Sequence, residues 1–475
     1  MSRRYDLVVI GGGTGGLVSA LIAAHVGARV ALIERDRTGG DCLWTGCVPS
    51  KSLIATAALA HRMRHAQAVG LTPVQPAIDF SRVMEHVQGL IATIEPRDSP
   101  ERLRAAGVEV IHGQGRFLGP GAIDAGGRSL GWRAAIIATG SEPKVPPISG
   151  LEAAEPLSTD NVWDLRELPA RLTVLGGGAV GCELGQAFAR LGSKVTLIEL
   201  AERLLPGEDP EAGELVGARL SEQGVQIRLG HRATGFTAAG ELQLDGPTGQ
   251  VAVTFDRILL GTGRTPRTDG LGLETVGISL ARDGTIPVNP RLRTANPRIF
   301  AVGDVTGLLP FTHVAAHHAR IATPNALFHL RGTVSEHLPR VTFTDPEVAS
   351  VGLSEAQARA RWGARVVVAR SDYATLDRAI TAGQADGFAK LIGDPRGRLV
   401  GATVAAPRAG EAIAELTAWI AGGATLDTVS RTVHAYPTFA EGPARAADLY
   451  LASRYGTARM RRSGRVALAA LRLLG

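Results

Sequence analysis

The sequence predicts an α/β protein that has two Rossmann-like units, each a parallel sheet packed against helices, and a C-terminal α+β domain. Three observations carry this prediction: a repeated segment, a glycine-rich turn within each copy, and a change of pattern near Pro339. The length of 475 residues corresponds to roughly three domains at about 150 residues each. Hydrophobic residues make up 45% and charged residues 20%, a balance that excludes a disordered or fibrous chain.

The repeat consists of residues 6–34 and residues 171–199. Each copy reads as an apolar strand, a Gly-x-Gly-x-x-Gly turn, a helix and a second strand that ends in glutamate. The register is identical, because Gly11, Gly13, Gly16 and Glu34 of the first copy match Gly176, Gly178, Gly181 and Glu199 of the second. The strand before the turn, the helix after it and the closing acid identify each copy as a dinucleotide-binding unit.

The residue types of the repeat suit a diphosphate. The first glycine permits a tight turn, the second lets the backbone approach the pyrophosphate, and the third allows close packing of strand and helix. The free N–H groups at the helix N-terminus then face the anion, and Glu34 and Glu199 can accept hydrogen bonds from a ribose hydroxyl. Two such sites in one chain suggest a bound flavin and an exchanging nicotinamide.

A second duplicated feature follows each unit, a strand that runs into a Thr-Gly turn. The turn residues are Thr139 and Gly140 after the first unit, and Gly263 after the second. A later strand, RIFAVGD, ends in Gly303 and Asp304, which suit the ribityl chain and ring edge of a flavin. We therefore expect a discontinuous FAD-binding domain, interrupted by an NAD(P)-binding domain; the expected bounds are 1–146 and 266–338 for the first and 147–265 for the second.

From Pro339 the pattern changes to strand-like runs, such as VTFTD and FAKLIGD, around helical ones. This predicts an α+β domain with an antiparallel sheet over residues 339–456. Residues 457–475 form a basic tail.

The chain has three cysteines, of which Cys42 and Cys47 lie in the segment GGDCLWTGCVPSK with four residues between them. Three are too few for a secreted disulfide scaffold, and no second pair or histidine cluster is near enough for a zinc site, so we expect no metal site. The pair is either two buried thiols or a redox pair, and a helix N-terminus would lower a thiol pKa. Cys182 lies in the second glycine turn and is expected to be a small packing residue.

These segments, together with TVHAYPTFAE near the C-terminus, resemble the class I pyridine nucleotide–disulfide oxidoreductases, a family that includes dihydrolipoamide dehydrogenase, glutathione reductase and mercuric reductase. The resemblance covers about residues 5–455, and Cys-x4-Cys-Val-Pro-Ser-Lys is a highly specific motif. It implies FAD at the first unit and NADH or NADPH at the second. It also implies that hydride passes to the flavin and then to a Cys42–Cys47 disulfide.

The resemblance further implies the roles of single residues. Cys47 would be the flavin-proximal, charge-transfer thiol and Cys42 the interchange thiol that faces the substrate. Lys51 would lie beside flavin N5, paired with Glu183, because a buried ammonium stabilises a reduced flavin and its carboxylate partner offsets the cost of burial. The family is dimeric, so we expect a homodimer in which the Glu441 region completes the partner's active site.

The electron acceptor is expected to be a metal ion, as in mercuric reductase, or a quinone. Disulfide reductases of the family carry a proton-shuttling histidine where this chain has Tyr436, and a phenol is a poor base at neutral pH. His434 lies two residues earlier, and no cysteine follows Cys182, whereas mercuric reductases end in a cysteine pair. A dihydrolipoamide dehydrogenase or another disulfide reductase is the alternative, and a non-turnover flavoprotein redox sensor is an alternative of another class.

Charge and composition bear on the partners. The net charge of +6 is dispersed and no nucleic-acid-binding motif occurs, so no nucleic-acid partner is expected. Glu199 would repel a 2′-phosphate and favours NADH, although Arg203 leaves NADPH open. Neither a signal peptide nor an apolar run long enough for a membrane span is found, so we expect a cytoplasmic protein.

Two rarer features remain. The chain has only four lysines, so a lysine kept at a chemically sensitive position is a candidate functional residue; the four are Lys51, Lys144, Lys194 and Lys390. The end of the chain, residues 451–475, has six arginines and no acidic residue. It is expected to form a terminal helix packed on its own dimer, and contact of this tail with an anionic membrane surface is the less favoured alternative.

Overall fold

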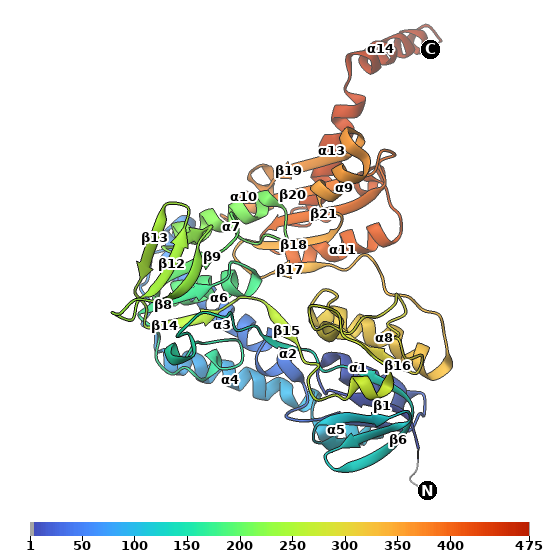
Figure 1. Cartoon of the computed structure of the whole chain (residues 1–475). Helices are drawn as coiled ribbons and strands as arrows, with labels where there is room; N and C mark the ends of the chain where they lie inside the picture. The colour runs from blue at the N-terminus through green and yellow to red at the C-terminus, as the bar shows by residue number, and fades with distance from the viewer. Residues whose placement is uncertain (1–3, 475) are drawn as a thin grey trace. The chain divides into compact units, whose positions relative to one another are not determined.

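The computed structural model describes residues 4–474 (Figure 1). The chain forms two compact units, and their bounds are 1–64, 75–200 and 231–335 for unit 1, and 65–74, 201–230 and 336–475 for unit 2. Residues 1–3 and 475, which the predicted domains include, lie outside the described residues. The predicted domain boundaries at 146, 265 and 338 stay predictions.

The first sheet of unit 1 is built on the first repeat. Its parallel strands are β1 (Tyr5–Ile10), β2 (Val30–Glu34), β3 (Val108–His112), β6 (Arg128–Ile137) and β16 (Ile299–Ala301), in the spatial order β3-β2-β1-β6 with β16 on the other side of β6. The antiparallel strands β5 (Ala122–Ala125) and β4 (Gly115–Gly119) continue from β6. Val8 and Val9 on β1 are both fully buried, as in a parallel sheet covered on both faces.

Helices cover this sheet and carry the cysteine segment. The helix of the repeat, α1 (Thr14–His25), packs against α8 (Thr312–Phe328). After β2 come α2 (Gly40–Trp44), α3 (Cys47–Arg64), α4 (Phe80–Ile94) and α5 (Pro100–Ala105).

The second repeat gives β8 (Arg171–Leu175), α6 (Ala179–Leu191) and β9 (Lys194–Glu199), and β14 (Arg257–Leu260) pairs with β8 in parallel. An antiparallel sheet of β11 (Arg232–Phe236), β12 (Leu242–Gly246) and β13 (Gly249–Val253) is inserted before β14. The two Thr-Gly turns lead into β7 (Ser141–Pro143) and β15 (Arg264–Pro266), which pair with each other. Both predicted dinucleotide units are therefore present as strand–turn–helix–strand.

Unit 2 contains the predicted antiparallel sheet, with its strands in the order β17-β18-β21-β20-β19. The strands are β17 (Arg340–Thr342), β18 (Glu347–Gly352), β19 (Val367–Asp372), β20 (Phe388–Gly393) and β21 (Leu399–Ala406). Helix α11 (Ala409–Ala421) packs against β18 and β21, and α13 (Glu441–Tyr455) packs against β19 and β20. The remaining elements include α7 (Pro210–Glu222), β10 (Gln226–Leu229), α9 (Glu355–Trp362), α10 (Asp377–Thr381), α12 (Leu426–Arg431) and α14 (Ala458–Leu474). The predicted fold class is confirmed.

One of the four lysines holds unit 2 together. Lys390 lies on the interior strand β20 with a side chain that is 5% exposed, and its Nζ lies 3.0 Å from Asp209 Oδ2 and 3.3 Å from Glu355 Oε2. It also forms an ion pair with Glu211. Burial opposes the charge, but the hydrogen bonds to Glu211 and Asp209 raise the pKa of Lys390 above its usual value. Because Asp209 also caps α7, this ammonium ties the start of α7 to the sheet.

Replacing Lys390 with methionine should lower the free energy of unfolding by about 3 kcal/mol, because the Asp209 carboxylate, 3% exposed, would lose its counter-charge. Denaturant unfolding followed by fluorescence measures this change. Lys194→Met is the matched control, since Lys194 is exposed at the start of β9 and its replacement should change stability by less than about 0.5 kcal/mol. Equal effects of the two substitutions would contradict the structural role of Lys390.

Candidate active site

The two glycine turns have the geometry that a diphosphate needs. A Cβ on Gly16 would lie 1.8 Å from the Gly11 carbonyl oxygen, and a Cβ on Gly181 would lie 1.8 Å from that of Gly176, so only glycine lets each helix cross its strand this closely. The middle glycines differ, because a Cβ on Gly178 would meet nothing within 4 Å.

The first turn repeats this arrangement. The nearest atom to a Cβ on Gly13 would be 3.8 Å away. Gly13 and Gly178 also precede α1 and α6 without any side-chain cap, so the first N–H groups of both helices face open space. The residues present therefore fit two dinucleotides.

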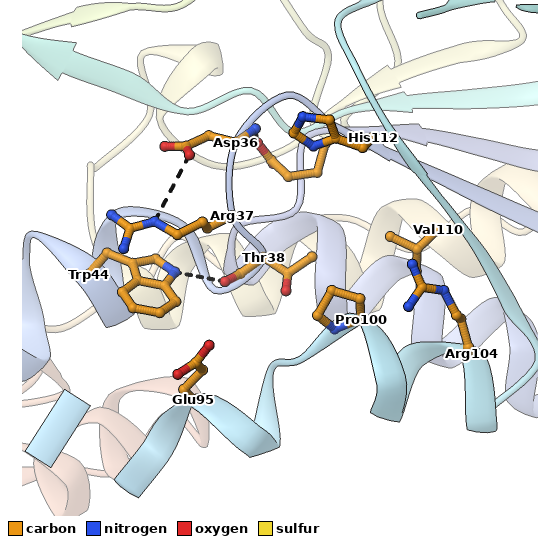
Figure 2. A pocket seen from close by; sticks show the side chains of 10 residues that line it. Asp36, Arg37, Thr38, Trp44, Glu95, Pro100, Arg104, Val110 and His112 are labelled. Carbon is orange, nitrogen blue, oxygen red and sulfur yellow. Dashed lines mark hydrogen bonds and ion pairs between the residues drawn. The ribbon is translucent and has the colours of Figure 1, made fainter. Parts of the chain in front are cut away.

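The glutamates that close the repeats fold back to the turns. Glu34 accepts a hydrogen bond from the Gly12 N–H at 2.5 Å, and Glu199 accepts one from the Gly177 N–H at 2.6 Å. These bonds hold both carboxylates beside the turn, where a ribose would lie. Glu34 also lines a cavity of about 210 Å³ (Figure 2), in which the Trp44 ring nitrogen donates to the Thr38 carbonyl at 2.8 Å.

The cysteine pair lies where α2 and α3 meet. Cys42 is on α2, Cys47 is the first residue of α3, and both are partly buried free thiols that share a hydrogen bond. That bond, the Thr312 hydroxyl at 3.2 Å from Cys47 Sγ, and nearby Lys51 lower the pKa of Cys47 to about 6, against the effect of burial. The same bond and burial raise the pKa of Cys42 well above its usual value. These contacts favour Cys47 over Cys42 as the thiolate of the reduced pair, and the roles of the two thiols and the disulfide form stay predictions.

Lys51 and Glu183 form an ion pair between the two repeats. Lys51 is one turn into α3 and its Nζ lies 2.8 Å from Oε2 of Glu183, which is on α6. The glutamate side chain is 7% exposed, so it needs this counter-charge. The structure therefore brings together two residues that are 132 positions apart.

The turn at Gly303 and Asp304 is fixed by residues that sequence reasoning missed. Ser141 donates a hydrogen bond to Asp304 Oδ2 at 2.6 Å, and Arg264 Nε donates to the Ser141 hydroxyl at 2.6 Å. Arg264 also forms an ion pair with Asp41, the residue before Cys42. The sequence carried two signals for them. Asp41 directly precedes Cys42, and Ser141 and Arg264 directly follow the two Thr-Gly turns.

A fully buried histidine, His318 on α8, supports the same turn. Its Nδ1 accepts a hydrogen bond from the Gly303 N–H at 3.2 Å. Burial lowers the pKa of His318 to about 4, so the ring is neutral and Nδ1 remains an acceptor at pH 7. The signal was the helical segment FTHVAAHHARIA, which contains both His318 and Thr312.

The other predicted residues of unit 1 lie as follows. Thr139 donates to the Arg267 carbonyl at 2.7 Å, and Gly140 and Gly263 adopt positive φ angles of 68° and 96°. Cys182 is buried and donates to the Gly177 carbonyl at 3.3 Å, and burial raises its pKa, as expected for a packing residue.

The predicted acceptor residues lie in unit 2. Tyr436 is 70% exposed, and its hydroxyl donates to Asp377 Oδ2 at 2.7 Å, which raises the pKa of Tyr436. His434 is turned toward Glu415, with 3.3 Å between Nε2 and Oε2, and its side chain is 9% exposed. Glu441 begins α13 and accepts from the Thr438 N–H at 2.8 Å.

Comparison with known proteins decides the family. Residues 5–319 match the family model described as pyridine nucleotide-disulphide oxidoreductase, and residues 338–447 match the dimerisation domain of the same family. The chain belongs to this family. It is an FAD-dependent enzyme that uses NAD(P)H, and its dimerisation domain supports a homodimer.

Several relatives resemble the oxidoreductase over nearly its whole length. Dihydrolipoyl dehydrogenase of Thermus scotoductus is 37% identical over 94% of this chain and 97% of its own. Mercuric reductase of Streptomyces lividans is also 37% identical, over 94% of this chain and 96% of its own. The solved Cu(II) complex of the HOCl-induced flavoprotein disulfide reductase RclA from Escherichia coli superposes with a TM-score of 0.83, at 28% identity, over 94% of this chain and 99% of that one.

Two further observations concern metal sites and membrane spans. Within residues 4–474, His, Cys, Asp and Glu side chains do not gather in any group of three or more that could hold a metal ion. Over the same residues, every helix is too short or too polar to cross a membrane.

The thiolate of the reduced enzyme should titrate near pH 6 and belong to Cys47, because the hydrogen bonds from Cys42 and Thr312 favour its charged form. Ultraviolet thiolate absorbance of the reduced holoenzyme against pH measures the midpoint. Thr312→Val removes one donor and should raise that midpoint, whereas Cys182→Ser is the control and should leave it unchanged. A titration that survives in Cys47→Ser would assign the thiolate to another residue.

Proposed function

We propose that the oxidoreductase passes electrons from NADH through Cys42 and Cys47 to a metal ion or a quinone, in preference to lipoamide or glutathione disulfide. The observation that carries this proposal is the hydrogen bond between Tyr436 and Asp377. This hydrogen bond engages the hydroxyl of Tyr436. Tyr436 occupies the position at which the disulfide reductases of the family carry the histidine that shuttles protons during dithiol–disulfide exchange.

FAD, when bound, accepts the hydride of NAD(P)H and hands an electron pair to sulfur. The pKa values of the two thiols and the charged side chains beside them favour the transfer of that electron pair. The low pKa of Cys47 keeps its sulfur anionic at neutral pH, and the high pKa of Cys42 keeps a proton on the other sulfur. Lys51 brings a positive charge close to Cys47, and the ion pair with Glu183 holds the lysine side chain in position. Glu199 at the second turn favours NADH, because a carboxylate there repels a 2′-phosphate.

Exchange with an external disulfide needs a group that accepts and returns a proton near pH 7. Tyr436 is unsuited as a general base, because its hydroxyl donates a hydrogen bond to the Asp377 carboxylate. This hydrogen bond raises the pKa of the phenol above its usual value. His434 has both ring nitrogens engaged, Nε2 with Glu415 and Nδ1 at 2.9 Å from the Thr432 carbonyl oxygen.

Soft metal ions and quinones can take electrons from a thiolate or a reduced flavin without such a shuttle. The resemblance to mercuric reductase and to a reductase solved with Cu(II) supports a metal-ion acceptor. The equally similar dihydrolipoyl dehydrogenase keeps lipoamide as the alternative. Membership in a family of enzymes supports turnover rather than a non-turnover redox sensor.

Reduction of the resting holoenzyme with NADH under anaerobic conditions should increase the number of titratable thiols by two, since a Cys42–Cys47 disulfide would open. Thiol titration under denaturing conditions before and after NADH measures the change. Cys42→Ser should abolish the increase, while Cys182→Ser should keep it. Equal counts before and after NADH would show that the pair does not take part in electron transfer.

In an acceptor panel, kcat/KM for a quinone, Cu(II) or Hg(II) should exceed kcat/KM for lipoamide. General acid–base help is typically worth about 10²–10⁴-fold, so its absence should weaken disulfide turnover by roughly that factor. Tyr436→His restores a base that Asp377 can orient and should raise lipoamide turnover by at least about tenfold.

The matched control is Tyr436→Phe, which removes the hydroxyl without adding a base and should leave lipoamide turnover low. Metal-ion and quinone turnover should change little in both variants. Wild-type enzyme that turns over lipoamide more efficiently than any metal ion or quinone tested would overturn the proposed acceptor class.

A further inference from the structure

The last helix of unit 2, α14, presents its side chains to solvent. Helix α13 ends at Tyr455, and α14 follows after a short turn (Figure 1). Every side chain that the structure describes from position 452 to position 473 is exposed. Within the described chain, α14 therefore does not bury its apolar residues against its own subunit.

Two faces run along α14. Arg461, Arg465 and Arg472 follow the four- and seven-residue spacing of one helix face. Met460, Ala467 and Leu471 share another side of the helix by the same spacing, and Met460 is 47% and Leu471 is 64% exposed. An amphipathic helix with arginines on one face and apolar side chains on another is typical of helices that lie in the plane of a membrane surface.

The charge of this region has one sign. No acidic residue follows Asp448 in the sequence, whereas six arginines do. The 17 residues of α14 include five of these arginines, so the helix is too short and too charged to cross a bilayer. A polyanion without an apolar layer, such as a nucleic acid, would match the arginines and leave the leucines in water.

A second feature lies at the base of α14. A cavity of about 220 Å³ is lined by Arg396, Arg431, Arg454, Tyr450 and Tyr455 at the end of α13, together with Asp427. Asp427 pairs with Arg431 at 2.9 Å, so two arginines of the lining are in excess over the single carboxylate. Guanidinium groups bind phosphate well, which makes this cavity suited to a lipid phosphate.

We propose that α14 and the arginine-lined cavity form a peripheral docking surface for an anionic phospholipid bilayer. The apolar side with Met460 and Leu471 enters the interface, the arginines meet the headgroup phosphates, and the cavity takes one headgroup beside the helix. This proposal does not depend on the electron acceptor, because none of its residues belongs to the candidate active site.

The test is flotation of the full-length holoenzyme with vesicles of phosphatidylglycerol and phosphatidylcholine in equal amounts, compared with vesicles of phosphatidylcholine alone. The enzyme should bind the anionic vesicles and leave the neutral ones, and salt should release it. Each arginine near an anionic surface contributes about fivefold in affinity, so replacing Arg461, Arg462 and Arg465 with Gln should weaken binding roughly 100-fold. Met460→Ser with Leu471→Ser should weaken it at least about tenfold.

The matched controls change exposed arginines and exposed apolar residues elsewhere on the surface. Arg282, Arg293 and Arg331 are exposed, and their joint replacement with Gln removes the same charge from unit 1. Leu280→Ser with Leu330→Ser removes two exposed leucines, and both control variants should bind anionic vesicles like the wild type. NADH-dependent acceptor reduction in each variant shows that the enzyme is folded.

Four results would overturn the proposal. Equal binding to neutral and anionic vesicles would remove the electrostatic part, and equal loss in the control variants would show that net charge alone acts. A chain that ends at Gly456, and that sediments as a monomer while it binds vesicles unchanged, would make α14 a dimer contact. Tighter binding of the arginine face to duplex DNA than to anionic vesicles, unaffected by the substitutions of Met460 and Leu471, would assign it to nucleic acid.

Discussion

The ion pair between Lys51 and Glu183 joins two helices whose N-termini both lie at predicted functional segments. Helix α3 begins at Cys47, and α6 begins directly after the second glycine turn, so one contact of 2.8 Å links the thiol segment to the predicted nicotinamide turn. The pair is constrained from both sides, because the buried glutamate needs a cation and the lysine can reach it only if the two helices keep their register. Gly181 helps to place α6 for this contact, since its backbone leaves no room for a side chain where α6 crosses β8.

The two thiols are chemically different although they lie in one short segment. Cys47 is the first residue of α3, and its hydrogen bonds with Cys42 and Thr312 lower its pKa. For Cys42, the hydrogen bond with Cys47 and burial raise the pKa by more than a hydrogen bond with Thr312 lowers it. Thr312 belongs to α8, the helix whose His318 also holds the Gly303 backbone. One helix therefore sets the charge of a sulfur and the shape of the predicted flavin turn together. A shift of α8 would change both, which ties the protonation of the thiol to the integrity of the cofactor site.

The sequence was sufficient for features that depend on local spacing. The strands and helices of both repeats follow from apolar runs, glycine positions and a closing acid, all within about thirty residues, and the antiparallel sheet follows from its strand-like runs. The ion pair of Lys51 with Glu183 came from the family resemblance. No pattern indicated the contacts of Arg264 with Asp41 or of Lys390 with Asp209, which join residues 223 and 181 positions apart. Such contacts arise only when distant elements pack, and a single sequence carries no periodic signal for them.

Residues for electron input and residues for electron output are under different physical constraints. Glu183 is 6% exposed, and the crossing glycines tolerate no Cβ, so a substitution at these positions would disturb packing as well as chemistry. Tyr436 is 70% exposed and has Asp377 as its hydrogen-bond partner, so a different side chain there leaves the core of unit 2 intact. A histidine, a tyrosine or another polar group can therefore occupy that position at little cost in stability. Equal similarity to a dihydrolipoyl dehydrogenase and to a mercuric reductase agrees with this difference, because packing fixes the residues predicted for electron input and does not fix the residue predicted for the acceptor.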